Sequence, residues 1–128
     1  MASGVVLDAS AILAVLFNEP GSEAVAPLID RAAVSAVNLA EAHAQLLRRG
    51  VKAEDAWRGL SELGCEVCPF DEPMARLAGE LAHPLRDPPL SFGGRACLAL
   101  ALSRKAAVYT TEAGWERLGL GVEVKVIR

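Results

Sequence analysis

The sequence predicts an α/β fold, a three-layer α/β/α sandwich around a mainly parallel central sheet. Short apolar runs alternate regularly with longer segments of helical periodicity. Parallel strands need a crossover helix between them, and these longer segments can supply it. With 128 residues and 52% hydrophobic residues, the chain has enough apolar material for one core. We therefore expect residues 1–128 to form a single domain.

The expected strands are short and apolar. They cover residues 4–7, 33–35, 65–70, 106–109 and 122–127. In the last of them, Val122, Val124 and Val126 alternate with Glu123 and Lys125, the period of a strand with one buried face.

The expected helices cover residues 11–17, 22–32, 37–49, 53–63, 72–85, 92–105 and 113–118. Ser10 and Ser91 are the residue type preferred at helix N-caps, directly before two of these segments. Gly50 and Gly64 follow two others, and Pro84 limits the fifth. Residues 96–102 are apolar on every side, which predicts a deeply buried helix.

Composition excludes several classes of protein. A net charge of -3 and a pI near 5.4 exclude a strongly basic nucleic-acid binder of the usual kind. The first apolar stretch carries Asp8 and has no Lys or Arg before it, unlike a secretory signal. Charged residues interrupt the chain too often for a membrane span, so we expect a cytoplasmic protein that does not enter a membrane.

The three cysteines cannot all pair within the chain. Cys65 and Cys68 lie three residues apart on an expected strand and should face opposite sides of the sheet. No second Cys/His pair accompanies them, so reduced, buried thiols are a better interpretation than a zinc site.

Three acids are expected at one edge of the sheet. Asp8 ends the first strand, Glu41 lies in the early turns of the helix after the second, and Glu112 follows the fourth. The Asp8 carboxylate lies at the rim of a core and needs a cation, and oxygen ligands favour Mg²⁺ or Mn²⁺. From spacing alone, a metal site and scattered acids at helix starts remain equally open.

Four segments of the chain carry a family resemblance. They are Val-Leu-Asp8-Ala-Ser10-Ala, Ser35-Ala-Val-Asn38-Leu-Ala-Glu41, Leu-Ser91-Phe-Gly-Gly94-Arg95-Ala-Cys-Leu-Ala-Leu-Ala and Tyr-Thr110-Thr111-Glu112-Ala-Gly-Trp115. In order and spacing they resemble PIN-domain ribonucleases of the VapC toxin type, and the resemblance spans essentially the whole chain.

This resemblance implies Mg²⁺- or Mn²⁺-dependent endonucleolytic cleavage of RNA. In the family four acids hold the metal, and Asp8, Glu41 and Glu112 match the first, second and fourth of them. Ser10 and Thr110 match supporting hydroxyls. Asn38 belongs to the second of the four segments and is expected to support the site.

The third acid is replaced by Gly94. If Ser91 is the N-cap, Gly94 occupies the N3 position, where an acid would favour the helix. The sequence therefore predicts an impaired nuclease, either as a natural property or as an alteration that disarms a toxin, unless Asp87 compensates. Restoring an aspartate at this position is expected to raise metal-dependent cleavage and to stabilise the metal-free fold modestly.

Basic residues are candidates for phosphate contacts. Arg48, Arg49 and Lys52 form the best local basic patch, and Arg86 and Arg95 are expected nearer the acids. We expect Arg95, which directly follows Gly94, to contact phosphate.

The resemblance also implies partners. These are an RNA substrate, with transfer RNA as a family-level expectation, and an antitoxin of the VapB type that presents a basic group to the acidic site. Trp57, Phe70, Leu77 and Leu81 add to an apolar excess that, with the resemblance, predicts a homodimer.

Two other functions remain open at this stage. A PIN-like protein without catalysis would bind only RNA or an antitoxin. A phospho-acceptor signalling domain of similar length is a more remote alternative, in which Asp71, after the third strand, would accept the phosphoryl group.

Overall fold

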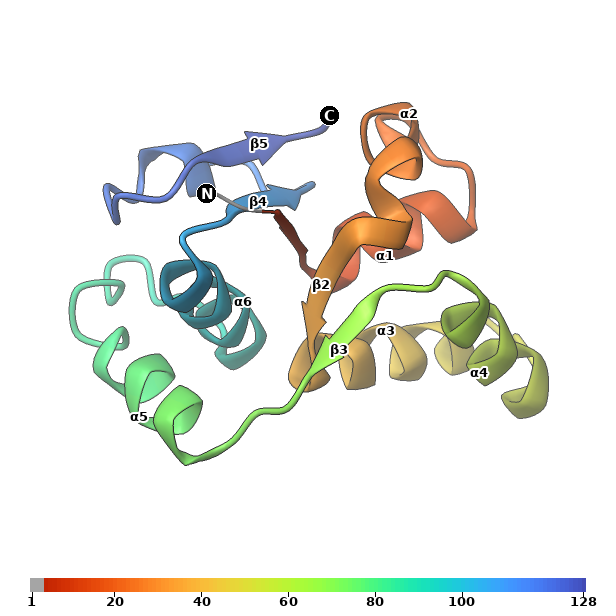
Figure 1. The fold of residues 1–128 in the computed structure, drawn as a ribbon, viewed down its shortest axis with the longest axis horizontal. Coiled ribbons are helices and arrows are strands. Elements are labelled where there is room, and N and C mark those ends of the chain that lie inside the picture. Colours follow the sequence, from red (N-terminus) through yellow and green to blue (C-terminus); the bar gives the residue numbers. More distant parts are fainter. Residues whose placement is uncertain (1–3) are drawn as a thin grey trace.

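A computed structural model describes residues 4–128 and contains a five-stranded, fully parallel sheet. The strands are β1 (Val5–Leu7), β2 (Ala32–Ser35), β3 (Glu66–Cys68), β4 (Ala107–Thr110) and β5 (Val124–Val126). Their order across the sheet is β3-β2-β1-β4-β5 (Figure 1). The predicted α/β fold class is confirmed.

Helices cover both faces of the sheet. The α-helices are α1 (Ala9–Leu16), α2 (Ser22–Val25), α3 (Ala36–Arg48), α4 (Ala53–Glu62), α5 (Glu72–Glu80) and α6 (Phe92–Arg104), and two 3₁₀ helices are η1 (Ala26–Arg31) and η2 (Trp115–Arg117). Figure 1 shows α5 and α6 on one side of the sheet and α1, α2 and α4 on the other. This is the predicted three-layer sandwich.

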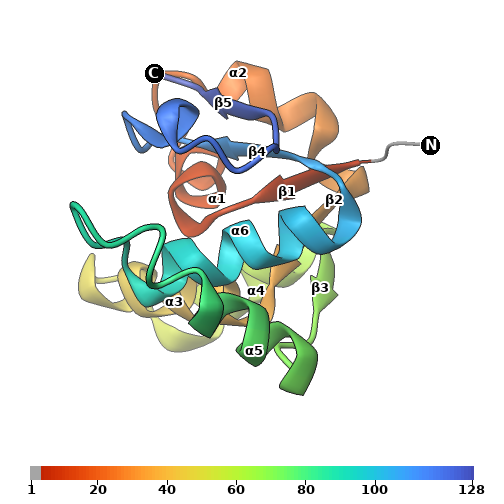
Figure 2. The same cartoon turned by 90° about the vertical axis from the view of Figure 1, so that its left-hand side faces the viewer.

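Alternate residues of the central strands supply two separate cores. Val6 and Ala33 pack with α5 and α6 on one face, whereas Leu7 and Val34 pack with α1, α3 and α4 on the other. Every residue of α6 from Ala96 to Ala101 is buried, as predicted for residues 96–102, whereas Leu102 at the end of that range is only half-buried. This helix runs beside β1 in Figure 2, and its start therefore lies close to the end of that strand.

Two expected elements are wrong in detail. The helix expected over 22–32 breaks into α2 and η1, because Pro27 has no N–H to donate within an α-helix, and Ala32 already belongs to β2. The N-cap of α1 is Asp8 rather than Ser10, since an Asp8 oxygen accepts the N–H of Ala11. Asp and Ser are equally good N-cap residues, so sequence could not separate them.

Several ends also differ from expectation. Helix α5 stops at Glu80 and is followed by turns, and β3 and β5 are each three residues long. The helix expected over 113–118 is the short η2, which begins after Gly114 in a left-handed conformation with a φ of 97°.

All three cysteines are free. Cys68 packs in the core under α5 and α6, and Cys65 packs against the opposite core, so they face opposite sides of the sheet as expected. Cys97 is fully buried, and burial raises the pKa of its thiol well above the ordinary value, with Asp8 and Glu41 adding to the shift. Cys65 is only half-buried. Over residues 4–128, no helix is long and apolar enough to cross a membrane.

Candidate functional site

A cavity of about 580 Å³ opens at the carboxyl ends of the strands. Strand order reverses between β1 and β4, and ligand sites of open parallel sheets lie at such a reversal. The wall of this cavity includes the three predicted acids together with residues from α1, α3, the loop before α6, and the chain after β4. The lining residues are Asp8, Ala9, Ser10, Leu13, Glu19, Asn38, Glu41, Gln45, Arg49, Pro89, Leu90, Ser91, Gly94, Thr111, Glu112, Trp115 and Arg128.

Asp8 is the buried acid of this cavity, only 5% exposed. Its Oδ1 accepts hydrogen bonds from Ser10 Oγ at 2.7 Å and from the backbone N–H of Ala11 at 3.0 Å. Its Oδ2 accepts one from Thr110 Oγ1 at 2.6 Å. Burial raises the pKa of Asp8 above its ordinary value, and these hydrogen bonds oppose that shift by stabilising the charged form.

The two predicted supporting hydroxyls connect Asp8 to the chain after β4. Ser10 Oγ accepts the backbone N–H of Thr111 at 2.9 Å. Thr110 Oγ1, fully buried, accepts the backbone N–H of Glu112 at 3.0 Å. Ser10 and Thr110 thus fix the start of α1 against the end of β4. They also fix the backbone position of the exposed Glu112.

Glu41 is held by Asn38 and by the close approach of α6. Asn38 Nδ2 donates to Glu41 Oε1 at 2.9 Å and to the carbonyl oxygen of Gly93 at 3.0 Å. Asn38 is only 1% exposed, and its Oδ1 is a buried acceptor without a partner in residues 4–128. A β-carbon at Gly93 would overlap the Glu41 carboxylate.

At the third acid position, apolar side chains occupy the neighbouring space. Ser91 is the N-cap of α6 and accepts the N–H of Gly94 at 3.1 Å, which confirms the predicted N3 position. A β-carbon at Gly94 would lie 2.9 Å from Leu90 Cγ and 3.0 Å from Trp115 Cζ2. An aspartate there would therefore displace part of this packing.

The carboxylates present do not complete the four-acid metal site that the resemblance implies. Across the described chain, no three Asp, Glu, His or Cys side chains come together closely enough to hold a metal ion. Both oxygens of Asp8 are engaged by hydrogen bonds, and the position that would supply another carboxylate is Gly94 beside Leu90 and Trp115.

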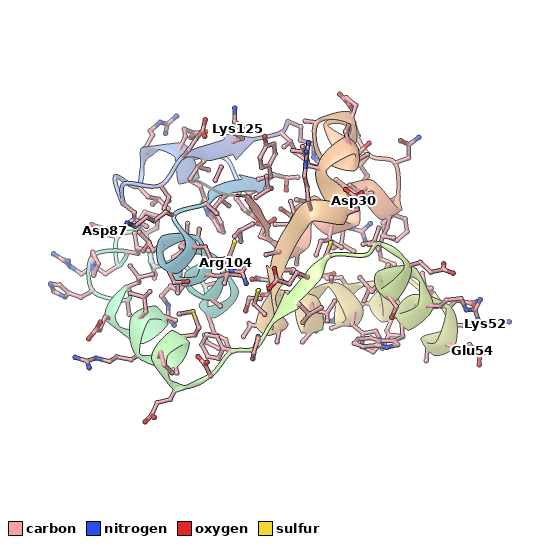
Figure 3. The ribbon with its side chains drawn as sticks, in the orientation of Figure 1. Asp30, Lys52, Glu54, Asp87, Arg104 and Lys125 are labelled. Atoms are coloured by element: carbon pink, nitrogen blue, oxygen red, sulfur yellow. The ribbon has the colours of Figure 1, made fainter. Side chains whose placement is uncertain are left out.

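Other predicted residues lie outside the cavity wall. Arg95 donates from Nη1 to the carbonyl oxygen of Ala78 at 2.9 Å, and its guanidinium lies 5.9 Å from the centre of the Phe92 ring. Asp87 is exposed on the loop before α6, and Lys52 points outward at the start of α4 (Figure 3). The structure brings none of these three side chains to the three acids.

The sequence did not predict which basic residues line the cavity. Arg49, expected only as one member of a patch, lines the cavity, and so do Glu19 and Arg128. These three residues come from widely separated segments, so no local spacing could have grouped them.

The topology also separates Asp71 from Asp8. Asp71 is the exposed N-cap of α5 and does not line the cavity. It follows the edge strand β3, and β2 lies between β3 and β1, whereas phospho-acceptor domains of the flavodoxin-like order place their first and third strands side by side. The phospho-acceptor alternative does not fit this strand order.

Known structures share this fold along nearly the whole chain. DNA-bound VapBC from Salmonella typhimurium aligns with a TM-score of 0.77 at 19% identity, over 97% of this chain and 98% of that chain. VapBC2 from Rickettsia felis, bound to a promoter DNA fragment, gives 0.75 at 17% identity, over 96% and 98%. VapBC-5 from Mycobacterium tuberculosis, described as a member of the VapBC family of toxin-antitoxin systems, gives 0.63 at 25% identity, over 99% of each chain.

Curated protein sequences give no match to this chain. The PIN domain, by contrast, matches residues 5–120. This range contains all four motif segments and extends from β1 to beyond η2. The match covers most of the chain, and the chain therefore belongs to the PIN domain family.

Proposed function

We propose that this chain is a toxin of the VapC type, paired with a VapB-type antitoxin, whose Mg²⁺- or Mn²⁺-dependent endoribonuclease activity is weakened by Gly94. One observation carries the proposal. Asp8, Glu41 and Glu112 line one cavity at the strand reversal of a PIN domain, while Leu90 and Trp115 pack beside Gly94.

The residues around the cavity have distinct roles in this proposal. Asp8 is the best fixed of the acids, because it ends a buried strand and receives three hydrogen bonds. Asn38 orients Glu41. Ser10 and Thr110 hold the Asp8 carboxylate and the segment that carries Glu112.

The partners follow from the same proposal. VapBC-5 from Mycobacterium tuberculosis belongs to a family of toxin-antitoxin systems, and an antitoxin here would place a cationic side chain, such as Arg, among the acids. A homodimer is proposed on weaker grounds. Leu81 is buried in the chain's own core and Phe70 and Leu77 pack against it, which leaves Trp57, 50% exposed, as the apolar side chain of that group available to a second copy.

The test compares four proteins: the parent chain, Gly94→Asp, the double variant Leu90→Ala/Gly94→Asp, and the double variant with Asp8→Asn added. Cleavage of a broad RNA pool is measured with Mg²⁺, with Mn²⁺ and with a chelator, and Mn²⁺ binding is titrated by calorimetry. We expect little or no cleavage by the parent. Metal-dependent cleavage should rise in Gly94→Asp and rise further in the Leu90→Ala/Gly94→Asp double variant. Adding Asp8→Asn should abolish both this increase and the Mn²⁺ binding.

Efficient metal-dependent cleavage by the parent, with no gain from Gly94→Asp, would contradict the proposed role of Gly94. The packing of Leu90 and Trp115 also favours a second candidate, a PIN domain that binds RNA or an antitoxin without cutting. For that protein, antitoxin or RNA binding persists while none of the variants gains cleavage.

A further inference from the structure

Side chains of both charges line the cavity. Its acids are Asp8, Glu19, Glu41 and Glu112, and its cationic side chains among the described residues are Arg49 and Arg128. An RNA strand that approaches the three acids without a compensating cation would be repelled, because every phosphate carries a negative charge. The position of these two arginines therefore bears directly on how RNA could enter.

Glu19 fixes both arginines. Its Oε2 accepts Arg49 Nη1 at 3.3 Å, and its Oε1 accepts Arg128 Nη1 at 3.2 Å. Arg128 Nη1 also donates to the carbonyl oxygen of Pro20 at 3.2 Å. The guanidinium of Arg49 additionally lies over the Phe17 ring, 4.5 Å from its centre.

Three separate parts of the chain meet in this cluster. Glu19 follows α1, Arg49 is the C-cap of α3, and Arg128 follows β5. Figures 1 and 2 both show the C-terminal end of the chain beside α2, and Ile127 near that end closely approaches Gly21, which lies between α1 and α2. The pairing is thus a product of the fold.

The cluster keeps a net positive charge and free donors. One carboxylate is shared by two guanidiniums, so the three side chains together carry a charge of about +1 at neutral pH. Each guanidinium has five N–H groups. Within residues 4–128, only the Nη1 atoms of Arg49 and Arg128 are used in hydrogen bonds, which leaves Nη2 and Nε of both.

We propose that Arg49 and Arg128, positioned by Glu19, form a binding subsite for a backbone phosphate of RNA in the cavity that Asp8, Glu41 and Glu112 also line. This inference rests on the proposed function only in taking RNA as the ligand. A planar guanidinium can bind phosphate oxygens in a bidentate manner, and the stacking on Phe17 restricts the positions that the Arg49 guanidinium can take. Such a contact positions the strand and carries no sequence information by itself.

The test measures binding directly, with the metal chelated so that cleavage does not interfere. Fluorescein-labelled single-stranded RNA is titrated with the full chain, and anisotropy is followed over a salt series. Arg49→Gln and Arg128→Gln should each weaken binding about fivefold at low salt and lower the salt slope by about 0.7, the value for one phosphate contact on a single strand. Arg49→Lys keeps the charge but loses the planar fork and the stacking on Phe17, so it should restore the salt slope and only part of the lost affinity.

The matched control is Arg76→Gln on α5. Arg76 also forms an exposed ion pair, with Glu80 at 3.0 Å, but it does not line the cavity, so binding should equal that of the parent. Glu19→Gln removes the one negative charge of the cluster but keeps a side-chain oxygen that can accept from one of the two arginines, so binding should be unchanged or tighter. A thermal melt of each variant confirms that it is folded at the assay temperature.

Equal binding by Arg49→Gln, Arg128→Gln and Arg76→Gln, while the parent binds RNA, would overturn the subsite and leave the proposed function intact. Absence of RNA binding by the parent in this metal-free assay would overturn the subsite, and absence of binding also with Mg²⁺ or Mn²⁺ present would overturn the proposed function as well. If the two arginine variants lose affinity for an acidic peptide or an antitoxin but keep their affinity for RNA, the two arginines serve a protein partner and the RNA subsite is wrong.

Discussion

The carboxylate of Glu41 lies directly against the α-carbon of Gly93, in the space that a β-carbon would fill. Asn38 spans the same junction, since its Nδ2 donates both to Glu41 and to the Gly93 carbonyl oxygen. Helices α3 and α6 therefore meet at the site through a contact that only glycine permits. The two adjacent glycines at the start of α6 differ in role: Gly93 leaves room for the Glu41 carboxylate, and Gly94 occupies the position where the family resemblance implies an acid.

Gly93→Ala is expected to destabilise the fold by about 1 to 3 kcal/mol, the range for forcing extra volume into a packed site. Glu41 must move, and its hydrogen bond from Asn38 lengthens or breaks. The measurement is urea unfolding, with Gly79→Ala on α5 as control. Nothing lies within 4 Å of a β-carbon at Gly79, so that variant should gain up to about 1 kcal/mol of helix propensity. Equal effects of the two variants would show that Glu41 moves away at no cost.

Asp8→Asn is expected to stabilise the protein at neutral pH and to flatten its pH dependence. Burial raises the folded-state pKa of Asp8 above the ordinary value of 3.8, so the folded chain binds this proton more tightly than the unfolded chain does. The stability that the proton contributes is present at low pH and is lost as pH rises from near 3.8 through the raised folded pKa. Asn carries no charge and does not share this loss.

Thermal melts of the parent and Asp8→Asn between about pH 4 and 8 check this sign. The gain should grow as pH rises through the raised folded-state pKa of Asp8 and then stay constant. Asp71→Asn makes the same chemical change at the exposed N-cap of α5 and is the control. Should Asp8→Asn be less stable than the parent, increasingly so toward the alkaline end of the range, the hydrogen bonds from Ser10 and Thr110 outweigh the cost of burial.

Much of the site could be predicted because strand ends and motif spacing are local properties. Asp8 ends a buried strand, and parallel strands bring Asp8, Glu41 and Glu112 to one edge wherever the exact boundaries fall. Ser91 as N-cap and Gly94 as N3 follow from the same local pattern.

What sequence could not predict depends on how distant segments pack. The overlap of Gly93 with Glu41 depends on the separation of α3 and α6, and the grouping of Glu19, Arg49 and Arg128 depends on where the chain lies after β5. Arg95 follows Gly94 in sequence, but on a helix the next residue lies about 100° further round, which directs Arg95 to α5.

Arg95→Gln is expected to cost about 1 kcal/mol of stability, since it removes a charged donor to the Ala78 carbonyl oxygen. RNA binding with the metal chelated should be unchanged. Arg76→Gln, which breaks an exposed pair with Glu80, should cost about 0.5 kcal/mol or less. Weaker RNA binding by Arg95→Gln, without loss of stability, would restore the sequence expectation that Arg95 contacts phosphate.

Gly94→Asp is expected to destabilise the metal-free fold, the reverse of what its place in α6 suggests. By local rules an acid at N3 adds about 0.3 to 1 kcal/mol, and replacing glycine adds several tenths more. The β-carbon, however, would lie 2.9 Å from Leu90 and 3.0 Å from Trp115, and the carboxylate would enter a buried position. Overpacking costs about 1 to 3 kcal/mol, and burial of the charge adds to it, so the packing term exceeds the helix term.

A double-mutant cycle with Leu90→Ala separates the two terms. If Leu90 occupies the space that the introduced aspartate side chain needs, Gly94→Asp will cost less in the Leu90→Ala background, with a coupling of about 1 kcal/mol. Urea unfolding of the four proteins, with the metal chelated, measures it. Strictly additive effects would mean that Leu90 swings aside freely, and Trp115, which is 8% exposed and has little room to move, would then be the remaining obstacle.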